Sequence, residues 1–104
     1  MFLVYAIISC DHKFIYVGIT GDIADRMRRH NAGYEKATKS YIPYVLLHAE
    51  PYETRPEARQ REVYLKSRSG KRLLYKIALS KITVLQRAGL SSWLRALKDQ
   101  DTSP

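Results

Sequence analysis

The sequence has little of what marks secreted or membrane-bound proteins. Its single cysteine, Cys10, has no partner within the chain, so we expect no internal disulfide and a reducing, cytoplasmic location. No apolar run approaches the roughly 18 residues that cross a bilayer, so we expect no membrane partner. The first residues, MFLVYAIISC, carry no positive charge, and we interpret them as a strand and not as a signal peptide.

The chain is too short for two full hydrophobic cores. Its 104 residues fit one domain, and a hydrophobic content of 45% is sufficient for a globular fold and argues against disorder. We expect this domain to cover residues 1–88. A C-terminal helical extension and a frayed tail are expected over residues 89–104.

Negative charge is scarce relative to positive charge, and the positive excess is concentrated in the second half. The net charge is +8. Residues 51–104 hold 12 Lys/Arg against 5 Asp/Glu, whereas residues 1–50 hold 6 against 5. A basic face attracts nucleic acids, because binding their phosphates releases condensed counterions. A solvated, solubilising face explains the same charge equally well.

The apolar spacing predicts elements in the order β-β-α-β-α-α. Apolar runs rich in β-branched and aromatic residues predict strands, and apolar residues three or four apart predict helices. The expected strands cover residues 2–9, 14–20 and 44–50, and the expected helices cover residues 23–31, 54–67 and 73–85, with a break at Ser69-Gly70. We therefore expect an α/β fold of the α+β kind, with helices flanking a small antiparallel three-stranded sheet.

Particular residues fix the ends of these helices. Asp22 has the chemistry of an N-cap, and Gly33 that of a helix end. Thr54 and Glu57 have the spacing of a capping box. A last short helix would carry the apolar side chains Trp93, Leu94 and Leu97, which either cover the domain or make a dimer contact. We favour the first, and a monomer, because a short chain needs the extra burial.

Two tyrosines stand out in otherwise aliphatic strands. Tyr5 and Tyr16 each carry a hydroxyl that needs a hydrogen-bond partner when buried. Tyrosine is common in strands, so either residue alone is weak evidence for chemistry. Gly18, two residues after Tyr16, is of the kind that lets a ligand or another backbone approach closely.

Three charged or polar residues lie on helical faces that border the core. Arg26 and His30 are four residues apart and share a face, although a solvated arginine is the simpler explanation of Arg26 alone. Glu62 lies on the apolar stripe of its helix, and a carboxylate there needs a cation. That cation is either a metal or the neighbouring Arg59 and Lys66, and the sequence supports both equally.

These residues follow one another in a familiar order. The series runs VYAI at 4–7, YVG at 16–18, Thr20, Asp22 to Arg26, His30-Asn31, Pro43, Glu57 to Arg59, and Glu62 with Tyr64 to Lys66. Over about residues 2–75 it resembles the GIY-YIG nuclease superfamily, and in particular its short stand-alone members. The tyrosine hairpin alone is a weak signal, but the whole series is specific.

The resemblance implies a role for each matching residue. Tyr5 and Tyr16 match the two motif tyrosines, Arg26 the catalytic arginine, His30 the histidine one turn later, and Glu62 the metal-binding glutamate. One Mg²⁺ (or Mn²⁺) ion is the implied cofactor. We favour Tyr16 as general base, assisted by Tyr5 or His30, and the sequence does not choose among these three.

The chain also departs from the family pattern. The first motif has Leu3-Val4-Tyr5 without its glycine, and the second has Val17 for isoleucine. The only asparagine is Asn31, so the asparagine that many members carry beyond the glutamate is missing. No separate DNA-binding domain is apparent, so a partner protein would have to supply specificity.

The implied activity is that of a metal-dependent endonuclease. It would hydrolyse phosphodiester bonds of duplex or branched DNA, as in DNA repair, with structure selectivity or weak specificity. Residues 55–76 hold 8 Lys/Arg against 2 Glu, so we expect them to border the cleft. The expected nucleic-acid contacts are Lys39, Arg59, Lys66, Lys71 and Arg72.

Two other functions fit the residues less well. One is a binding module with the same fold and little catalysis, which the presence of Arg26 and Glu62 disfavours. The other is an RNA-binding or protein-interaction domain in which exposed aromatic residues stack unpaired bases beside Lys36 and Lys39. Its surface would consist of Tyr34, Tyr41, Tyr44 and Tyr52.

The catalytic hypothesis makes a geometric demand. Tyr5 and Tyr16 share a face of the hairpin only if residues whose numbers sum to an odd value lie opposite each other. We expect this register, with both hydroxyls opening on one cleft that also contains Arg26 and Glu62.

Overall fold

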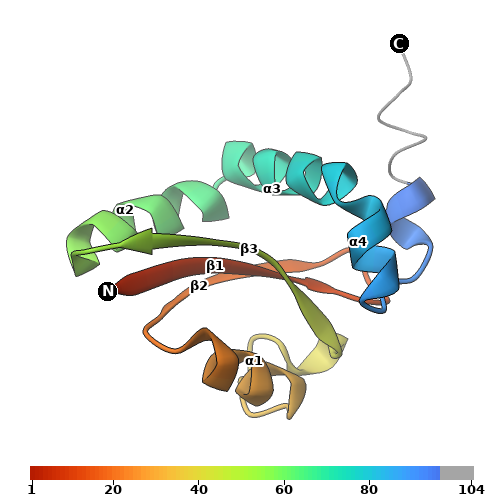
Figure 1. Ribbon diagram of the computed structural model, residues 1–104, viewed down its shortest axis with the longest axis horizontal. Helices are drawn as coiled ribbons and strands as arrows, with labels where there is room; N and C mark the ends of the chain where they lie inside the picture. Colours follow the sequence, from red (N-terminus) through yellow and green to blue (C-terminus); the bar gives the residue numbers. More distant parts are fainter. Residues whose placement is uncertain (97–104) are drawn as a thin grey trace.

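A computed structural model describes residues 1–96 of the protein (Figure 1). Its sheet and helices follow the expected order, with one additional helix. The strands are β1 (Phe2–Ser9), β2 (Ile15–Thr20) and β3 (Tyr44–Tyr52). The α-helices are α1 (Ile23–Asn31), α2 (Arg55–Lys66), α3 (Arg68–Ser80) and α4 (Ile82–Arg87), and a 3-10 turn covers Lys39–Tyr41. The α+β prediction is confirmed.

The sheet is antiparallel with β1 at its centre, in the order β2-β1-β3. Tyr5 lies opposite Gly18, and Ile7 lies opposite Tyr16. The numbers of each pair sum to an odd value, so Tyr5 and Tyr16 point to the same face. The expected register is confirmed. β2 and β3 are both edge strands, and the β1–β3 pairing is shifted by a bulge between Ala6 and Ile7.

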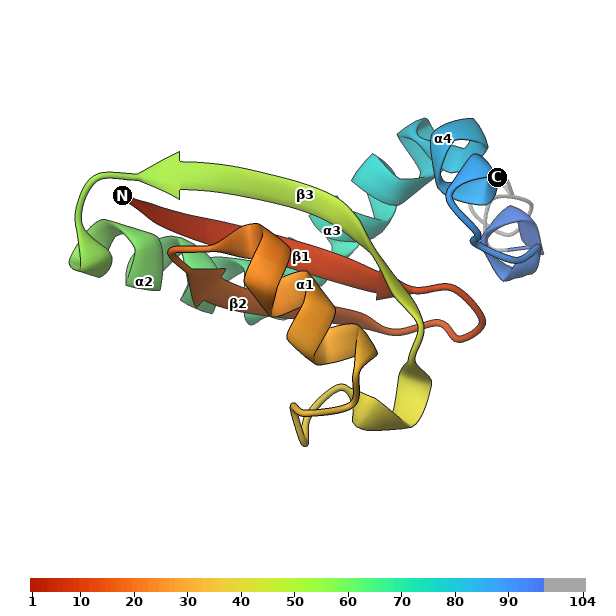
Figure 2. The same cartoon turned by 60° about the horizontal axis from the view of Figure 1, so that its bottom comes forward.

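Helices cover both faces of the sheet. α1 lies against one face, and α2 and α3 lie against the other (Figures 1 and 2). The α2–α3 side is aliphatic, with Val4, Ala6 and Ile8 of β1 packed on Leu65 and Leu74. The α1 side is smaller and aromatic, and it contains Tyr5, Ile7, Tyr44, Phe14, Tyr16, Ile23 and Met27. The α1 face therefore holds the polar atoms that need partners.

Side-chain caps fix where the helices begin. The Asp22 carboxylate accepts from the Asp25 N–H, and the Thr54 hydroxyl accepts from the Glu57 N–H, as expected. The predicted break at Ser69-Gly70 and the single helix over residues 73–85 are wrong. Ser67 ends α2 and caps α3 by accepting from the Gly70 N–H, so α3 begins earlier. A separate α4 follows it.

The segment after α4 folds back on the start of the chain. Residues 93–96 are helical, and the Cys10 carbonyl accepts hydrogen bonds from the Ser91 N–H, the Ser91 hydroxyl and the Trp93 indole. Leu90 and Leu94 are buried in the same core as β1. Trp93 and Leu94 thus cover the domain, whereas Leu97 and the expected frayed tail lie outside the described residues. Within residues 1–96, no helix has the length and apolarity to cross a membrane.

Gly70 permits the close contact between α2 and α3. A Cβ at this position would collide with the backbone of Tyr64 and Leu65. We expect Gly70→Ala to destabilise the fold by about 1–3 kcal/mol, as overpacked cores do. Gly21→Ala is the matched control, because a Cβ there meets no atom within 4 Å. Urea unfolding of both variants checks this prediction. A more stable Gly70→Ala protein, as helix propensity alone would give, would contradict it.

Candidate active site

Four of the five predicted catalytic residues meet on the α1 face of the sheet. α1 presents Arg26 and His30 from adjacent turns, and the hairpin presents Tyr5 and Tyr16 from facing strands. The ring centroids of Tyr5 and Tyr16 are 6.4 Å apart, and those of Tyr16 and His30 are 5.2 Å apart. The Arg26 guanidinium carbon lies 6.0 Å from the centroid of the Tyr5 ring.

A chain of short hydrogen bonds runs through this cluster. The Tyr5 hydroxyl and His30 Nε2 are 2.7 Å apart, and His30 Nδ1 and the Thr38 hydroxyl are 2.8 Å apart. The Thr38 hydroxyl in turn donates to the Glu35 carbonyl at 3.4 Å. Because Thr38 has only one proton, it accepts from a protonated Nδ1, and Nε2 then accepts from Tyr5. This assignment satisfies each of these buried polar atoms.

The protonation states agree with that direction. Burial raises the pKa of Tyr5 to about 12 against the opposing effect of Arg26, so its phenol keeps its proton at neutral pH. Burial and the positive charge of Arg26 lower the pKa of His30, so the imidazole is neutral. A neutral imidazole has one donor and one acceptor, as the chain of hydrogen bonds requires.

The loop between α1 and β3 holds this arrangement in place. The Asn31 side chain accepts from the Tyr44 N–H at 2.7 Å and donates to the Tyr44 carbonyl at 3.1 Å. The Tyr44 hydroxyl donates to the Thr38 carbonyl at 2.8 Å. The end of α1 is therefore tied to the start of β3, and Thr38 is positioned beneath His30.

Arg26 has a donor without a partner. Its Nε is buried and makes no hydrogen bond within residues 1–96. The nearest charge is the Glu35 carboxylate, whose Oε1 lies 3.8 Å away and is shared with Arg29 at 3.4 Å. A buried N–H that stays unpaired costs about 1–3 kcal/mol. The position is suited to an acceptor that arrives with a ligand.

Burial divides the four residues into two pairs. Tyr5 and His30 are completely buried, so neither can touch a substrate directly. Tyr16 is half-buried, and the Arg26 side chain is 29% exposed. Tyr16 and Arg26 are therefore the members of the cluster that solvent reaches.

Glu62 comes from the other side of the sheet. Its side chain is only 9% exposed and lies on α2 between the buried Ala58 and Leu65. Its Oε1 accepts from Arg59 at 2.8 Å, and its Oε2 is 3.1 Å from the Lys66 ammonium. These ion pairs are the non-metal explanation that the sequence left open. The five residues thus form no single set of contacts within the described chain.

Glu62 is a single carboxylate, and both of its oxygens have cationic partners in the structure. Within residues 1–96, no group of three or more His, Cys, Asp or Glu side chains gathers at one point. Magnesium is commonly bound by one or two carboxylates with waters and substrate phosphates completing its shell. A buried carboxylate that already attracts two cations fits such a site. Arg59 and Lys66 would have to move away to expose it.

The predicted nucleic-acid contacts differ in their freedom to bind. Arg59 and Lys66 are 68% and 48% exposed at the side chain, and both pair with Glu62. Lys39 and Arg72 are exposed. Lys71 is half-buried, its ammonium donates to the Ile15 carbonyl, and burial lowers its pKa. Lys71 therefore ties α3 to β2 in addition to any contact with a phosphate.

Three members of the site escaped the sequence analysis. Glu35 and Thr38 lie in the polar loop over residues 34–42, where nothing in the residue spacing distinguishes them. Tyr44 was grouped with exposed aromatic residues, but it is 3% exposed and belongs to the core. Its place next to Pro43 at the start of a strand was the only available signal of burial.

Comparison with known proteins finds one family model and several relatives with similar sequences. The sequence model of the GIY-YIG catalytic domain matches residues 1–76. A UPF0213 protein of Haloquadratum walsbyi is 40% identical over 62 residues, which cover 59% of this chain and 70% of that protein. A UPF0213 protein of Halobacterium salinarum is 36% identical over 72 residues, which cover 66% and 94%. One of Bacillus velezensis is 35% identical over 69 residues, which cover 65% and 70%. No solved structure matches the chain.

The hydrogen-bonded state of His30 can be tested by NMR. We expect its ring to be neutral with the proton on Nδ1, and to stay neutral as the pH falls below about 6.5, the value of an unstructured histidine. Since the unfolded chain then binds the proton more readily, stability should decline as the pH falls through that region. Nitrogen-detected titration measures both tautomer and pKa. A His30 pKa at or above 6.5 would contradict the prediction.

Proposed function

The chain belongs to the GIY-YIG family and has a nuclease-type fold, and from this premise we propose that it is a divalent-metal-dependent endonuclease acting on DNA. The observation that carries the proposal is the buried Nε of Arg26, which makes no hydrogen bond within residues 1–96 and belongs to a guanidinium 6.0 Å from the Tyr5 ring. A phosphodiester oxygen would satisfy that donor. The guanidinium would then stabilise the charge that develops on the phosphoryl group during hydrolysis.

The proton chemistry favours Tyr16 as the group that activates the attacking water. Tyr5 is buried, and its pKa of about 12 keeps it protonated. His30 Nε2 accepts a hydrogen bond from the Tyr5 hydroxyl, so its one basic nitrogen is already engaged. The Tyr16 ring lies 6.4 Å from the Tyr5 ring and 5.2 Å from the His30 ring, between centroids, and it is only half-buried. A phenol acts as base at neutral pH only when nearby cations stabilise its anion.

Glu62 is the proposed metal ligand. A hydrated Mg²⁺ or Mn²⁺ ion held there would supply Lewis-acid stabilisation of the phosphate and the leaving group. β2 is an edge strand, and α2 contacts both β1 and β2. DNA lying along the open edge of β2 would be within reach of residues from both helical layers. The proposal requires Tyr16, Arg26 and Glu62 to act on one phosphate although they belong to different layers.

The basic residues have a role in this arrangement. Arg59 and Lys66 neutralise Glu62 in the absence of metal, and a metal ion would free them to bind DNA phosphates. Lys39 and Arg72 would add contacts from the loop and from α3. Such contacts release counterions, so DNA affinity should fall steeply with salt. They carry no sequence information, which suits a structure-selective or weakly specific enzyme acting with a partner protein.

One observation favours the second candidate, a nucleic-acid-binding module without efficient catalysis. Both carboxylate oxygens of Glu62 have cationic partners within the protein. If these ion pairs persist in the presence of metal, Glu62 is structural and the basic surface serves binding alone. Activity and metal binding must therefore be measured on the same preparations.

Arg26 and Glu62 are expected to serve chemistry more than folding. Arg26→Ala and Glu62→Gln should each reduce plasmid nicking by about 10²–10³, the usual loss for one positioned electrostatic group. Arg28→Ala and Glu53→Gln are matched controls, because Arg28 and Glu53 are exposed and lie outside the candidate site. Calorimetry should show that Mn²⁺ binding is lost only in Glu62→Gln.

Folding and DNA affinity are recorded by circular dichroism and fluorescence anisotropy. Nicking at the wild-type rate by both site variants would eliminate this active site. Mn²⁺ binding that is absent in the wild-type protein, or that persists in a folded Glu62→Gln protein, would assign Glu62 to an ion pair and favour the binding module.

A further inference from the structure

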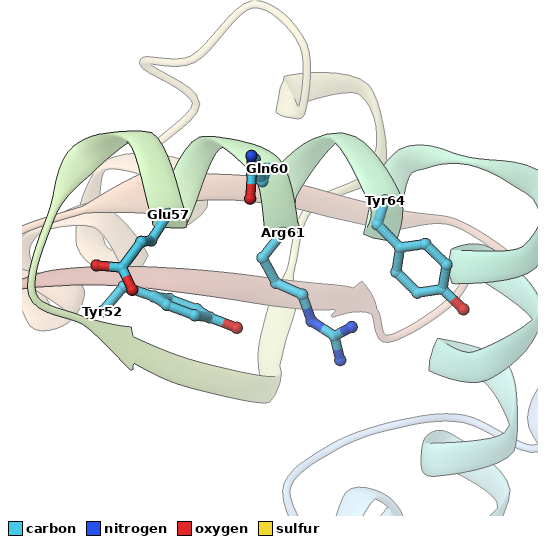
Figure 3. A pocket seen from close by; sticks show the side chains of 5 residues that line it. All are labelled: Tyr52, Glu57, Gln60, Arg61 and Tyr64. Carbon is cyan, nitrogen blue, oxygen red and sulfur yellow. The ribbon is translucent and has the colours of Figure 1, made fainter.

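A pocket lies on the side of the sheet that α2 covers, between α2 and the end of β3. Its volume is about 330 Å³, and its lining is formed by Tyr52, Glu57, Gln60, Arg61 and Tyr64. Figure 3 shows the Arg61 side chain between the rings of Tyr52 and Tyr64, with Glu57 beside Tyr52. None of these residues belongs to the tyrosine, histidine and arginine cluster on the α1 face.

One carboxylate outside the pocket lining, that of Glu50, fixes the positions of two lining residues, Arg61 and Tyr52. Glu50 accepts two hydrogen bonds from the Arg61 guanidinium, at 2.8 and 3.0 Å. It also accepts from the Tyr52 hydroxyl at 2.7 Å and lies 2.6 Å from His48 Nε2. Burial raises the pKa of Glu50, but the hydrogen bonds from Arg61, Tyr52 and His48 outweigh it and lower the pKa to about 2. The carboxylate is therefore ionised at neutral pH, and it holds Arg61 and Tyr52 in place.

The charge of the pocket disfavours a phosphate. The Arg61 guanidinium is neutralised by the two-point contact with Glu50, and Glu57 adds a negative charge at the rim. No lysine lines the described pocket. An occupant that is planar, neutral and able to hydrogen-bond fits these walls better than an anion.

The walls have the flat surfaces that such a group needs. Tyr64 is a large side chain that is 42% exposed to solvent. Its ring centroid is 5.2 Å from the Arg61 guanidinium carbon. Aromatic rings and arginine planes stack nucleobases without regard to sequence. The Gln60 amide and the Glu57 carboxylate offer donors and acceptors for the edge of a base. The carboxylate suits an exocyclic amino group.

We propose that this pocket takes one unpaired nucleobase of the DNA on which the enzyme acts. The proposal rests on the proposed nuclease function and specifies its substrate class. A perfect duplex keeps its bases stacked and would leave the pocket empty. A bulge, a flap or a branch point offers a base at little cost. The pocket would thus supply structure selectivity from the same compact domain.

The test compares duplexes that differ by a single unpaired base. A 2-aminopurine is placed either in a one-base bulge or in a paired position, and binding is followed by anisotropy and by its fluorescence. We expect the wild-type protein to bind the bulged duplex at least about tenfold more tightly, with quenching of the probe, since one base–aromatic stack is worth that much. Tyr64→Leu should bring the ratio close to one without weakening binding of the perfect duplex.

Tyr34→Leu is the matched control, because Tyr34 is exposed, at 66%, and lies outside the pocket. It should preserve both the ratio and the quenching. A ratio that persists in Tyr64→Leu, or that falls equally in Tyr34→Leu, would overturn the proposal. Equal binding of free 2-aminopurine nucleotide and bulged duplex would also overturn it, because the occupant would then be a nucleotide and not a strand.

The experiment separates this inference from the nuclease proposal. If the protein nicks and binds perfect duplex but shows no preference for the bulge, the pocket inference alone fails. If the bulged duplex is preferred through Tyr64 but no DNA is cut under any metal condition, the pocket inference holds and the endonuclease proposal fails. Loss of binding to every duplex would remove both.

Discussion

The candidate site depends on one hydrogen bond, between the Tyr5 hydroxyl and His30 Nε2 at 2.7 Å. Both side chains are completely buried, and either one left unpaired would cost about 1–3 kcal/mol. The bond ties β1 to α1, and through Thr38 it extends to the loop over residues 34–42. Because α1 is held in this position, the Arg26 guanidinium lies 6.0 Å from the Tyr5 ring, and its Nε makes no hydrogen bond within residues 1–96. The buried pair therefore sets the geometry of the exposed pair.

The two layers divide the work of the domain. The aliphatic side beneath α2 and α3 supplies most of the buried apolar surface, and close contact at Gly70 lets these helices pack. The α1 side has the polar and aromatic groups that chemistry needs. Glu62 is the exception, since it is a carboxylate on the aliphatic side, paired with Arg59 and Lys66. A polar group in that position is explained by the proposed metal role or by the ion pairs themselves.

Much of this organisation could be predicted from local sequence. The spacing of apolar residues predicts the strands, and the polar side chains of Asp22 and Thr54 predict the helix caps. The odd-sum register of the hairpin predicts that Tyr5 and Tyr16 share a face. The start of α3 could not be predicted in this way, because the break between α2 and α3 depends on the Ser67 hydroxyl and not on the more conspicuous Gly70. The roles of Thr38 and Glu35 could not be predicted from the sequence either, since they depend on how the loop over residues 34–42 folds back against α1. The opposite layers of Glu62 and Arg26 are likewise a tertiary property that spacing along one helix cannot give.

The central claim is that Tyr16, held by the Tyr5–His30 pair, activates the water that attacks DNA. Single-turnover cleavage of a labelled duplex by Tyr16→Phe tests it most directly, with DNA affinity measured on the same protein. Loss of a general base typically lowers the rate by about 10²–10⁴. The account predicts a loss of this size with unchanged affinity and fold, and with normal rates in the Tyr34→Phe control. Cleavage by Tyr16→Phe at the wild-type rate would contradict it.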